Sequence, residues 1–240
     1  EPGSTDVLRA ELKWLGGVLA EARDAQVMRE RLSRLLDTQP VELVLGPVAR
    51  RIDDEMDARF KSGRADADIA LGSERYFRLL DQLDALCAAP GFADAAGRPV
   101  RRELPRLLQA DLNRVRKRHR AVVAADTPEA RSLALHEVRK AAKRLRYAAE
   151  TAQPVFGKRA KRLAARAEAI QEVLGEHQDT VVARATLREI GIRAHLAGEN
   201  GFTFGRLHAL EEARAEELVR GYPPLMKQLP ARKLKVWLEH

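Results

Sequence analysis

The strongest constraint on the fold is the spacing of apolar residues, which recur in steps of three and four along almost the whole chain. Leu8, Leu12, Leu15 and Leu19 show the pattern, and later segments repeat it. This spacing places apolar side chains on one face of a helix, and the strict alternation typical of a half-buried strand is absent. We therefore expect an all-α protein built from antiparallel helical bundles. We expect helices at about 6–36, 41–60, 73–87, 104–124, 128–152, 158–190, 206–219 and 224–236.

Glycine and proline clusters separate these helices. The expected breaks lie at Gln39-Pro40, Lys61-Ser62-Gly63, Ala89-Pro90-Gly91 through Arg98-Pro99, Gln153-Pro154 with Gly157, Gly198 through Gly205, and Gly221-Tyr222-Pro223-Pro224. Thr127 before Pro128 is typical of an N-cap followed by proline at the first helical position. This predicts a helix that begins at about residue 128.

The chain also contains an internal repeat at an offset of 155 residues. Leu8, Ala10, Val18, Leu19, Glu21, Asp24, Val27, Arg29 and Leu32 match Leu163, Ala165, Val173, Leu174, Glu176, Asp179, Val182, Arg184 and Leu187. Because polar and apolar positions both match, we interpret the chain as two related helical halves, 1–90 and 91–237, with a cleft between them. Residues 238–240 are interpreted as a tag remnant.

The positive charge is concentrated in one part of the chain. Residues 101–162 carry a net charge of +12, whereas the rest of the chain carries −4. A strongly basic segment in a mildly acidic chain indicates a patch that attracts a polyanion, such as nucleic acid, acidic lipid or polyphosphate.

The most informative segment is 135–150, which has two faces at about 100° per residue. Leu135, Val138, Ala142, Leu145 and Ala149 form an apolar stripe for the core. The cationic stripe consists of His136, Arg139, Lys140, Lys143, Arg146 and Tyr147, with Arg144 beside it. It extends about 16 Å, which is enough for several consecutive anionic groups.

A solvated helix face is the alternative interpretation of this stripe. However, pairs such as Arg139 with Lys143 place like charges four residues apart, which costs a few tenths of a kcal/mol for each pair. A helix that accepts this repulsion is expected to meet an anion or facing carboxylates. Arginine forks and lysine charges together suit phosphate oxygens. His136 can donate from both ring nitrogens only when it is protonated, and its alternative role is a bond to a backbone carbonyl.

These residues resemble the CHAD family, the conserved histidine α-helical domain. The resemblance rests on His136, Arg139, Lys143, Arg144, Leu145, Arg146, Tyr147 and Glu150, and on the segments Trp14–Asp24 and Leu174–Asp179. It implies two four-helix bundles related by a pseudo-twofold axis, with a basic groove or pore that binds inorganic polyphosphate. It also implies a binding module, found alone or with a fused or associated triphosphate-processing domain.

One departure concerns the first half. The family has a basic helix in each half, and the repeat offset places the counterpart of His136 before residue 1, so we expect the first bundle to lack its N-terminal helix. Lys13 and Arg23 lie where the family has basic residues in that half, and they are second-rank ligands with ion pairing as the alternative. Arg114, Lys117 and Arg118 are further second-rank ligands on the preceding basic helix.

The sequence offers no catalytic constellation and no metal site. His119 continues an apolar spacing and is expected to be structural. His177 aligns with Ala22 in the repeat, which argues against chemistry that needs this imidazole in both halves. Glu21 with Asp24, and Glu176 with Asp179, could seat a divalent cation, but ion pairs with arginines are the simpler interpretation. No phosphate-binding loop, nucleophile elbow or Cys-x-x-Cys motif is present. We expect no cofactor.

The composition predicts a reducing compartment. Cys87 is the only cysteine, and no apolar stretch is long enough to cross a membrane. We expect a cytoplasmic protein, associated with polyphosphate-containing granules, that does not bind a membrane.

We therefore expect a non-enzymatic module that binds inorganic polyphosphate. Nucleic-acid binding is the first alternative, but aromatic residues are only 5% of the chain and Tyr147 alone lies in the basic stripe. A metal-dependent polyphosphate or triphosphate hydrolase is the second alternative, and a purely structural interaction bundle is the third.

Overall fold

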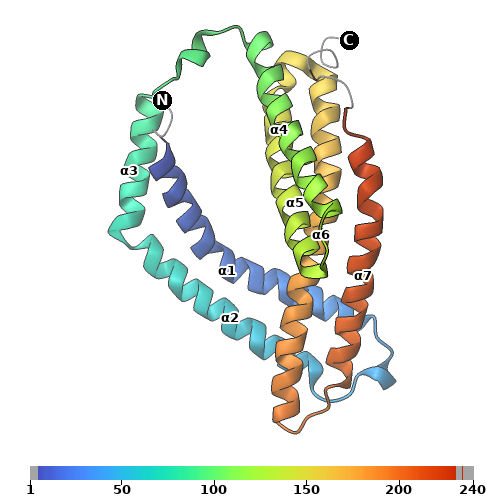
Figure 1. Ribbon diagram of the computed structural model, residues 1–240. Helices are drawn as coiled ribbons and strands as arrows, with labels where there is room; N and C mark the ends of the chain where they lie inside the picture. Colours follow the sequence, from blue (N-terminus) through green and yellow to red (C-terminus); the bar gives the residue numbers. More distant parts are fainter. Residues whose placement is uncertain (1–4, 231–233, 235–240) are drawn as a thin grey trace. The chain divides into compact units, whose positions relative to one another are not determined.

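A computed structural model describes residues 5–230 and 234 of the chain (Figure 1). These residues form α-helices and two short 3-10 helices and contain no strand, which confirms the expected all-α fold. The α-helices are α1 (Asp6–Asp37), α2 (Val48–Leu71), α3 (Glu74–Ala88), α4 (Val100–Val123), α5 (Pro128–Thr151), α6 (Gln153–Leu196) and α7 (Phe202–Lys227). The 3-10 helices are Val41–Leu43 and Asp94–Gly97.

The chain divides into two compact units. Unit 1 comprises Glu1–Ala96 and Ala185–His208, and unit 2 comprises Gly97–Arg184 and Ala209–His240. The long helices α6 and α7 contribute to both units. These units follow from which residues pack together, whereas the expected halves 1–90 and 91–237 follow from the sequence repeat. The two divisions are therefore different, and the halves and their pseudo-symmetry stay a prediction. Residues 238–240, interpreted above as a tag remnant, lie outside the described residues.

Unit 1 is organised around the pairing of α1 with α2. Met28 and Leu32 of α1 are buried together with Ile52 and Met56 of α2. The two helices lie close together at Gly63, where a Cβ atom would lie 2.7 Å from the backbone nitrogen of Ala22. Gly63 therefore serves as a contact point between helices.

The expected break at Lys61-Ser62-Gly63 is wrong for this reason. The helix predicted at 41–60 instead begins at Val48, after the 3-10 helix, and continues to Leu71. A glycine inside a helix costs up to about 1 kcal/mol relative to alanine. Close packing of α1 on α2 offsets that cost, so α2 continues through Gly63 without a break.

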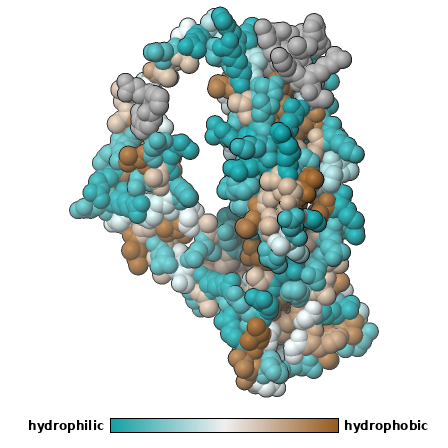
Figure 2. Space-filling view, in the orientation of Figure 1, coloured by the Kyte–Doolittle hydropathy of each residue, from teal (hydrophilic) through white to brown (hydrophobic). Residues whose placement is uncertain are grey.

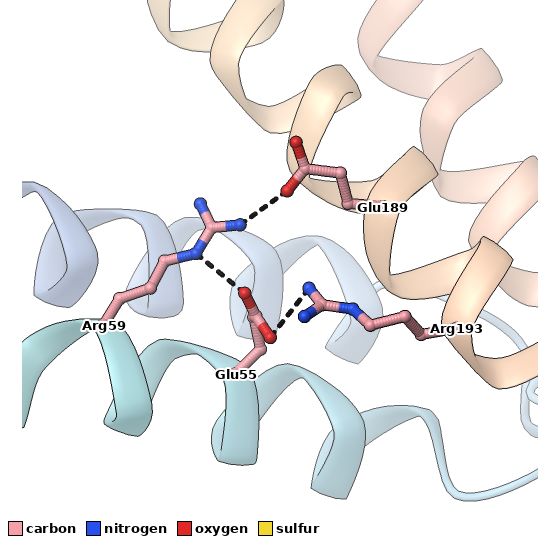
Figure 3. Close-up of polar contacts among 4 residues, drawn as sticks. All are labelled: Glu55, Arg59, Glu189 and Arg193. Carbon is pink, nitrogen blue, oxygen red and sulfur yellow. Dashed lines mark hydrogen bonds and ion pairs between the residues drawn. The ribbon is translucent and has the colours of Figure 1, made fainter.

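Alternating charges connect α2 to the C-terminal part of α6 within unit 1 (Figure 3). Arg59 contacts Glu55 at 2.8 Å and Glu189 at 2.7 Å, and Arg193 contacts Glu55 at 2.8 Å. Burial tends to raise the pKa of Glu55, but hydrogen bonds from Arg193 and Arg59 lower it below its ordinary value. The positive charges of Arg59 and Arg193 are thus neutralised by carboxylates of the protein itself.

Unit 2 has the larger continuous core. Leu108, Leu112 and Val115 of α4, the apolar stripe of α5, and the N-terminal half of α6 belong to one buried cluster that also includes Tyr222 of α7. α5 starts where the sequence predicts, because the Thr127 hydroxyl accepts a hydrogen bond from the Ala130 backbone N–H at 3.1 Å. It ends at Thr151, and α6 follows with a non-helical Gly157 in its first turns.

The break predicted at Gly221-Tyr222-Pro223-Pro224 is also wrong. Helix α7 continues through residues 206–227 with Pro223 and Pro224 inside it, and so joins the helix predicted at 206–219 to the first residues of the one predicted at 224–236. Residues 231–233, 235 and 236 of the second predicted helix lie outside the described residues. Tyr222 is 1% exposed, and its hydroxyl lies 2.8 Å from the His119 Nδ1. Burial of this side chain favours the helical path despite the backbone hydrogen bonds that prolines remove. α6 likewise continues past its predicted end at 190 to Leu196.

No described helix is both long enough and apolar enough to cross a membrane.

Candidate anion-binding site

α5 presents two different faces in unit 2. Leu135, Val138, Ala142, Leu145 and Ala149 are all buried, as their spacing predicts. On the other side, Lys140, Lys143, Arg144 and Tyr147 are exposed, while His136, Arg139 and Arg146 are half-buried. We call these seven residues the α5 basic face. Hydrophilic residues also cover much of the surface of α4 in the view of Figure 2.

Arg139 lies against α6. A Cβ atom on Gly175 would be only 3.2 Å from the Arg139 Nε, so the guanidinium occupies the space left by the glycine. The Nε is buried without a hydrogen-bond partner, and Arg139 makes no ion pair with any described residue. A buried donor without an acceptor costs free energy, and no described carboxylate neutralises the positive charge of Arg139.

Asp111 forms ion pairs with two of the residues predicted to bind the anion, Arg114 and Arg144. Its carboxylate is 9% exposed and accepts contacts at 2.8 Å from both Arg114 and Arg144. The two guanidinium groups, from α4 and α5, are thereby fixed side by side. Both remain largely exposed, so each still presents N–H groups to the solvent.

Glu137 plays a similar part at the N-terminal end of the face. Lys140 donates a hydrogen bond to one carboxylate oxygen, and Arg118 lies 3.6 Å from the other. The hydrogen bond from Lys140, with the charges of Lys140 and Arg118, lowers the pKa of Glu137. Glu137 is therefore ionised at neutral pH and offsets part of the local positive charge.

The C-terminal end of the face is centred on Tyr147. The Arg146 guanidinium lies 4.9 Å from the ring centroid and 2.9 Å from Glu168 of α6. The Lys143 ammonium lies 5.8 Å from the same ring, and Lys143 makes no ion pair within the described chain. Arg146 is thus oriented by a carboxylate, whereas Lys143 is free to meet an anion.

His136 is half-buried, and its Nδ1 is buried without a partner. The alternative role of a bond from this nitrogen to a backbone carbonyl is therefore absent in the described structure. The ring contributes an uncommitted polar atom at the start of the basic face.

The second-rank ligands have different surroundings. Arg114 and Arg118 are bound to Asp111 and Glu137, and Lys117 is exposed beside them. Lys13 and Arg23 are exposed on α1 of unit 1, where Arg23 pairs with Asp24 at 3.6 Å. A role for Lys13 and Arg23 in binding stays a prediction, as does a basic cleft.

Among the carboxylates expected to pair with arginines, Asp24 lies 3.6 Å from Arg23 and Glu176 lies 4.0 Å from Arg214. Among the described residues, no group of three or more histidine, cysteine, aspartate or glutamate side chains could hold a metal ion. His119 is structural, as predicted: it contacts Tyr222, and burial lowers its pKa.

Asp111 and Glu168, which orient Arg144 and Arg146, and Gly175, which leaves space for Arg139, are not among the site residues predicted from the sequence. Asp111 carried a signal, because it stands between Leu108, Leu112 and Val115 at core spacing. Gly175 lies in the segment Leu174–Asp179 that carries the family resemblance, but its role beside Arg139 depends on how α6 lies against α5, as does the role of Glu168.

The comparisons with known proteins agree with this architecture. The CHAD domain model matches residues 1–188 of the chain. The chain belongs to the CHAD family. The crystal structure of the CHAD domain from the plant Ricinus communis is similar over 94% of this chain and 73% of that one, with a TM-score of 0.66 and 26% sequence identity.

Two curated relatives come from Mycobacterium tuberculosis. The uncharacterized protein Rv2226 of strain H37Rv and the uncharacterized protein MT2285 of strain CDC 1551 are each 41% identical to this CHAD domain over 210 residues. The match covers 86% of this chain but 39% of each relative. The chain therefore spans less than half the length of these relatives.

Proposed function

We propose that this CHAD domain is a non-enzymatic module that binds inorganic polyphosphate through the α5 basic face. The observation that carries the proposal is the arrangement of the cations on that face. Arg139 and Lys143 make no ion pair with the described residues, and Arg144 and Arg146 are oriented by carboxylates on neighbouring helices. A linear row of cations, some oriented by carboxylates and some without an ion pair, suits a polymer of closely spaced phosphates.

The binding mechanism is electrostatic. Each lysine or arginine that neutralises a phosphate releases condensed counterions from the polymer, so affinity falls steeply as salt increases. The arginines add bidentate hydrogen bonds to phosphate oxygens. Asp111 and Glu137 reduce the net charge of the face, and the affinity is accordingly lower than a count of cations suggests.

Nucleic-acid binding is the principal alternative. Tyr147 is the one aromatic residue of the basic face, and Arg146 and Lys143 already lie over its ring. Base stacking on this face is therefore poorly supported. Hydrolysis of polyphosphate or triphosphate and a purely structural role are the remaining alternatives.

The biological setting is also part of the proposal. We expect a cytoplasmic protein associated with polyphosphate-containing granules. The greater length of the relatives leaves room for a fused or associated triphosphate-processing domain in such proteins. No part of the binding proposal depends on that domain.

Calorimetric titration with long-chain polyphosphate at two salt concentrations tests the function. The test variant is Lys140→Gln/Lys143→Gln/Arg144→Gln, which removes three exposed cations from the basic face. The control is Arg34→Gln/Arg64→Gln/Arg78→Gln, which removes three exposed cations from unit 1. We expect the test variant to bind at least tenfold more weakly and with a shallower salt dependence, and the control to change little.

Other results would favour the alternatives. Equal loss in both variants would indicate that only net charge matters. Stronger binding of duplex DNA than of polyphosphate at equal phosphate concentration would favour a nucleic-acid protein. Release of orthophosphate with Mg²⁺ or Mn²⁺ would indicate a hydrolase, and no binding at all would favour a structural role.

A further inference from the structure

A pocket of about 500 Å³ lies in unit 2, where the first turns of α5, the middle of α6 and the C-terminal half of α7 meet. No residue of the α5 basic face lines it. Its apolar surface comes from Leu135, Val181, Ala215 and Val219. Contact between such a surface and an apolar group is favourable, because it removes apolar area from water. Apolar side chains cannot form hydrogen bonds or ion pairs with a chain of phosphates.

His177 gives the pocket a polar centre. The residue is 6% exposed, and its ring makes no hydrogen bond with the part of the chain that the structure describes. Burial lowers the pKa of His177, and the charge of Arg184 lowers it further, so the ring is neutral at pH 7. A neutral imidazole presents one N–H donor and one acceptor. His177 lines the pocket, so a polar ligand group there can form a hydrogen bond with its ring.

Charged side chains surround the pocket. Arg131, Arg184 and Arg220 contribute three positive charges, and Glu212 and Glu216 contribute two negative ones. One Nη of Arg184 contacts Glu212 at 2.7 Å, while the Arg184 Nε is buried without a partner. With His177 neutral, the lining carries one excess positive charge, which matches a ligand with a single negative charge.

We propose that this pocket binds a small organic monocarboxylate. The apolar body of the ligand packs on Val181, Ala215 and Val219. Its carboxylate accepts hydrogen bonds from the His177 ring and from Arg184 or Arg220. This site is independent of polyphosphate binding, because its residues are not those of the basic face.

Titration with decanoate tests the proposal, with the His177 ring followed by NMR and the affinity measured by calorimetry. The resonance is assigned by its loss in His177→Gln. Acetate provides the carboxylate without the apolar body, and 1-decanol provides the body without the charge. We expect decanoate to bind with a stoichiometry of one and to shift the His177 signal, and both other probes to bind at least tenfold more weakly.

Two matched variants locate the site. Ala215→Leu fills the pocket, whereas Ala213→Leu makes the same change at an exposed position of α7. We expect the first to weaken decanoate binding at least tenfold and the second to leave it unchanged. Arg220→Gln removes an exposed cation without changing the core, and it should weaken decanoate several-fold but not 1-decanol.

Three results would overturn the proposal. The first is an unmoved His177 signal at saturating decanoate. The second is equal weakening by Ala215→Leu and Ala213→Leu, which would place the ligand on another apolar surface. The third is equal affinity for acetate and decanoate, which would indicate a general anion site.

Discussion

At the scale of single residues, the arginines of the basic face depend on small neighbours. Asp111 orients Arg144, and Gly175 makes room for Arg139. Positioned guanidinium groups lose less entropy when they bind an anion than free ones do. The binding strength of the face is therefore sensitive to residues that never touch the ligand.

Two glycine substitutions separate these roles. In Gly175→Ala the new Cβ meets only the Arg139 side chain, so we expect the free energy of unfolding to stay the same or to rise by up to about 1 kcal/mol. Polyphosphate affinity should fall several-fold, because Arg139 is displaced. In Gly63→Ala the new Cβ meets backbone, and we expect destabilisation by about 1–3 kcal/mol without a change in affinity of the folded protein. Denaturant unfolding and calorimetry distinguish the two. The same response from both variants would contradict this assignment.

His119, which is half-buried, and His177, which is buried, make the stability of the protein depend on pH. Burial lowers the pKa of His119 and of His177 below the ordinary value of 6.5, so the unfolded chain binds protons that the folded protein excludes. Their contribution is therefore fully present above pH 6.5 and is lost as the pH falls below it. We expect a slope of at most about 1.4 kcal/mol per pH unit for each histidine.

Urea unfolding between pH 7.5 and 5 measures this slope. His177→Gln should make it shallower, whereas His195→Gln, at an exposed position, should not. A wild-type protein that becomes more stable over this range of falling pH would contradict the prediction.

At the scale of elements, α5 is the decisive helix, because it contributes to the core with one face and to the candidate site with the other. Its start depends on the Thr127 cap, and its basic face depends on carboxylates from α4 and α6. Loss of the first helical turn would move His136 more than the residues near Tyr147.

Thr127→Ala should destabilise the protein by about 1 kcal/mol, because the Ala130 backbone N–H loses its acceptor. Thr5→Ala is a matched control, since Thr5 precedes α1 but its side chain makes no capping hydrogen bond. Thermal unfolding of both variants measures the difference. Equal effects would show that the cap of α5 contributes nothing.

At the scale of the whole molecule, unit 2 carries the concentrated positive charge, whereas several arginines of unit 1 are neutralised by facing carboxylates. The α5 basic face contains six cationic or ionisable side chains in addition to Tyr147. We expect the logarithm of polyphosphate affinity to fall linearly with the logarithm of salt concentration, with a slope no steeper than about −5.

Binding should also favour long polyphosphate over pyrophosphate at equal phosphate concentration, because a longer chain reaches more of these cations. Titrations at several salt concentrations with both ligands measure the slope and the preference. Salt-independent binding, or equal affinity for the two ligands, would contradict an electrostatic mechanism along the helix.

The helical class, the start of α5 and the separation of its two faces can be predicted from the order of residues alone. These features depend on local periodicity and capping, which act within a few residues along the chain. The same local rules failed at Gly63 and at Pro223-Pro224, where contacts with distant helices outweigh the propensity to break a helix.

Which cations are paired with carboxylates and which are unpaired depends on the packing of the helices. Asp111 and Glu168 reach Arg144 and Arg146 from other helices, and the pocket at His177 is assembled from three. These contacts depend on the rotation and spacing of packed helices, which the order of residues along one helix does not specify. The types of side chain in the candidate sites can therefore be identified from single helices, but the arrangement of these side chains depends on how the helices pack.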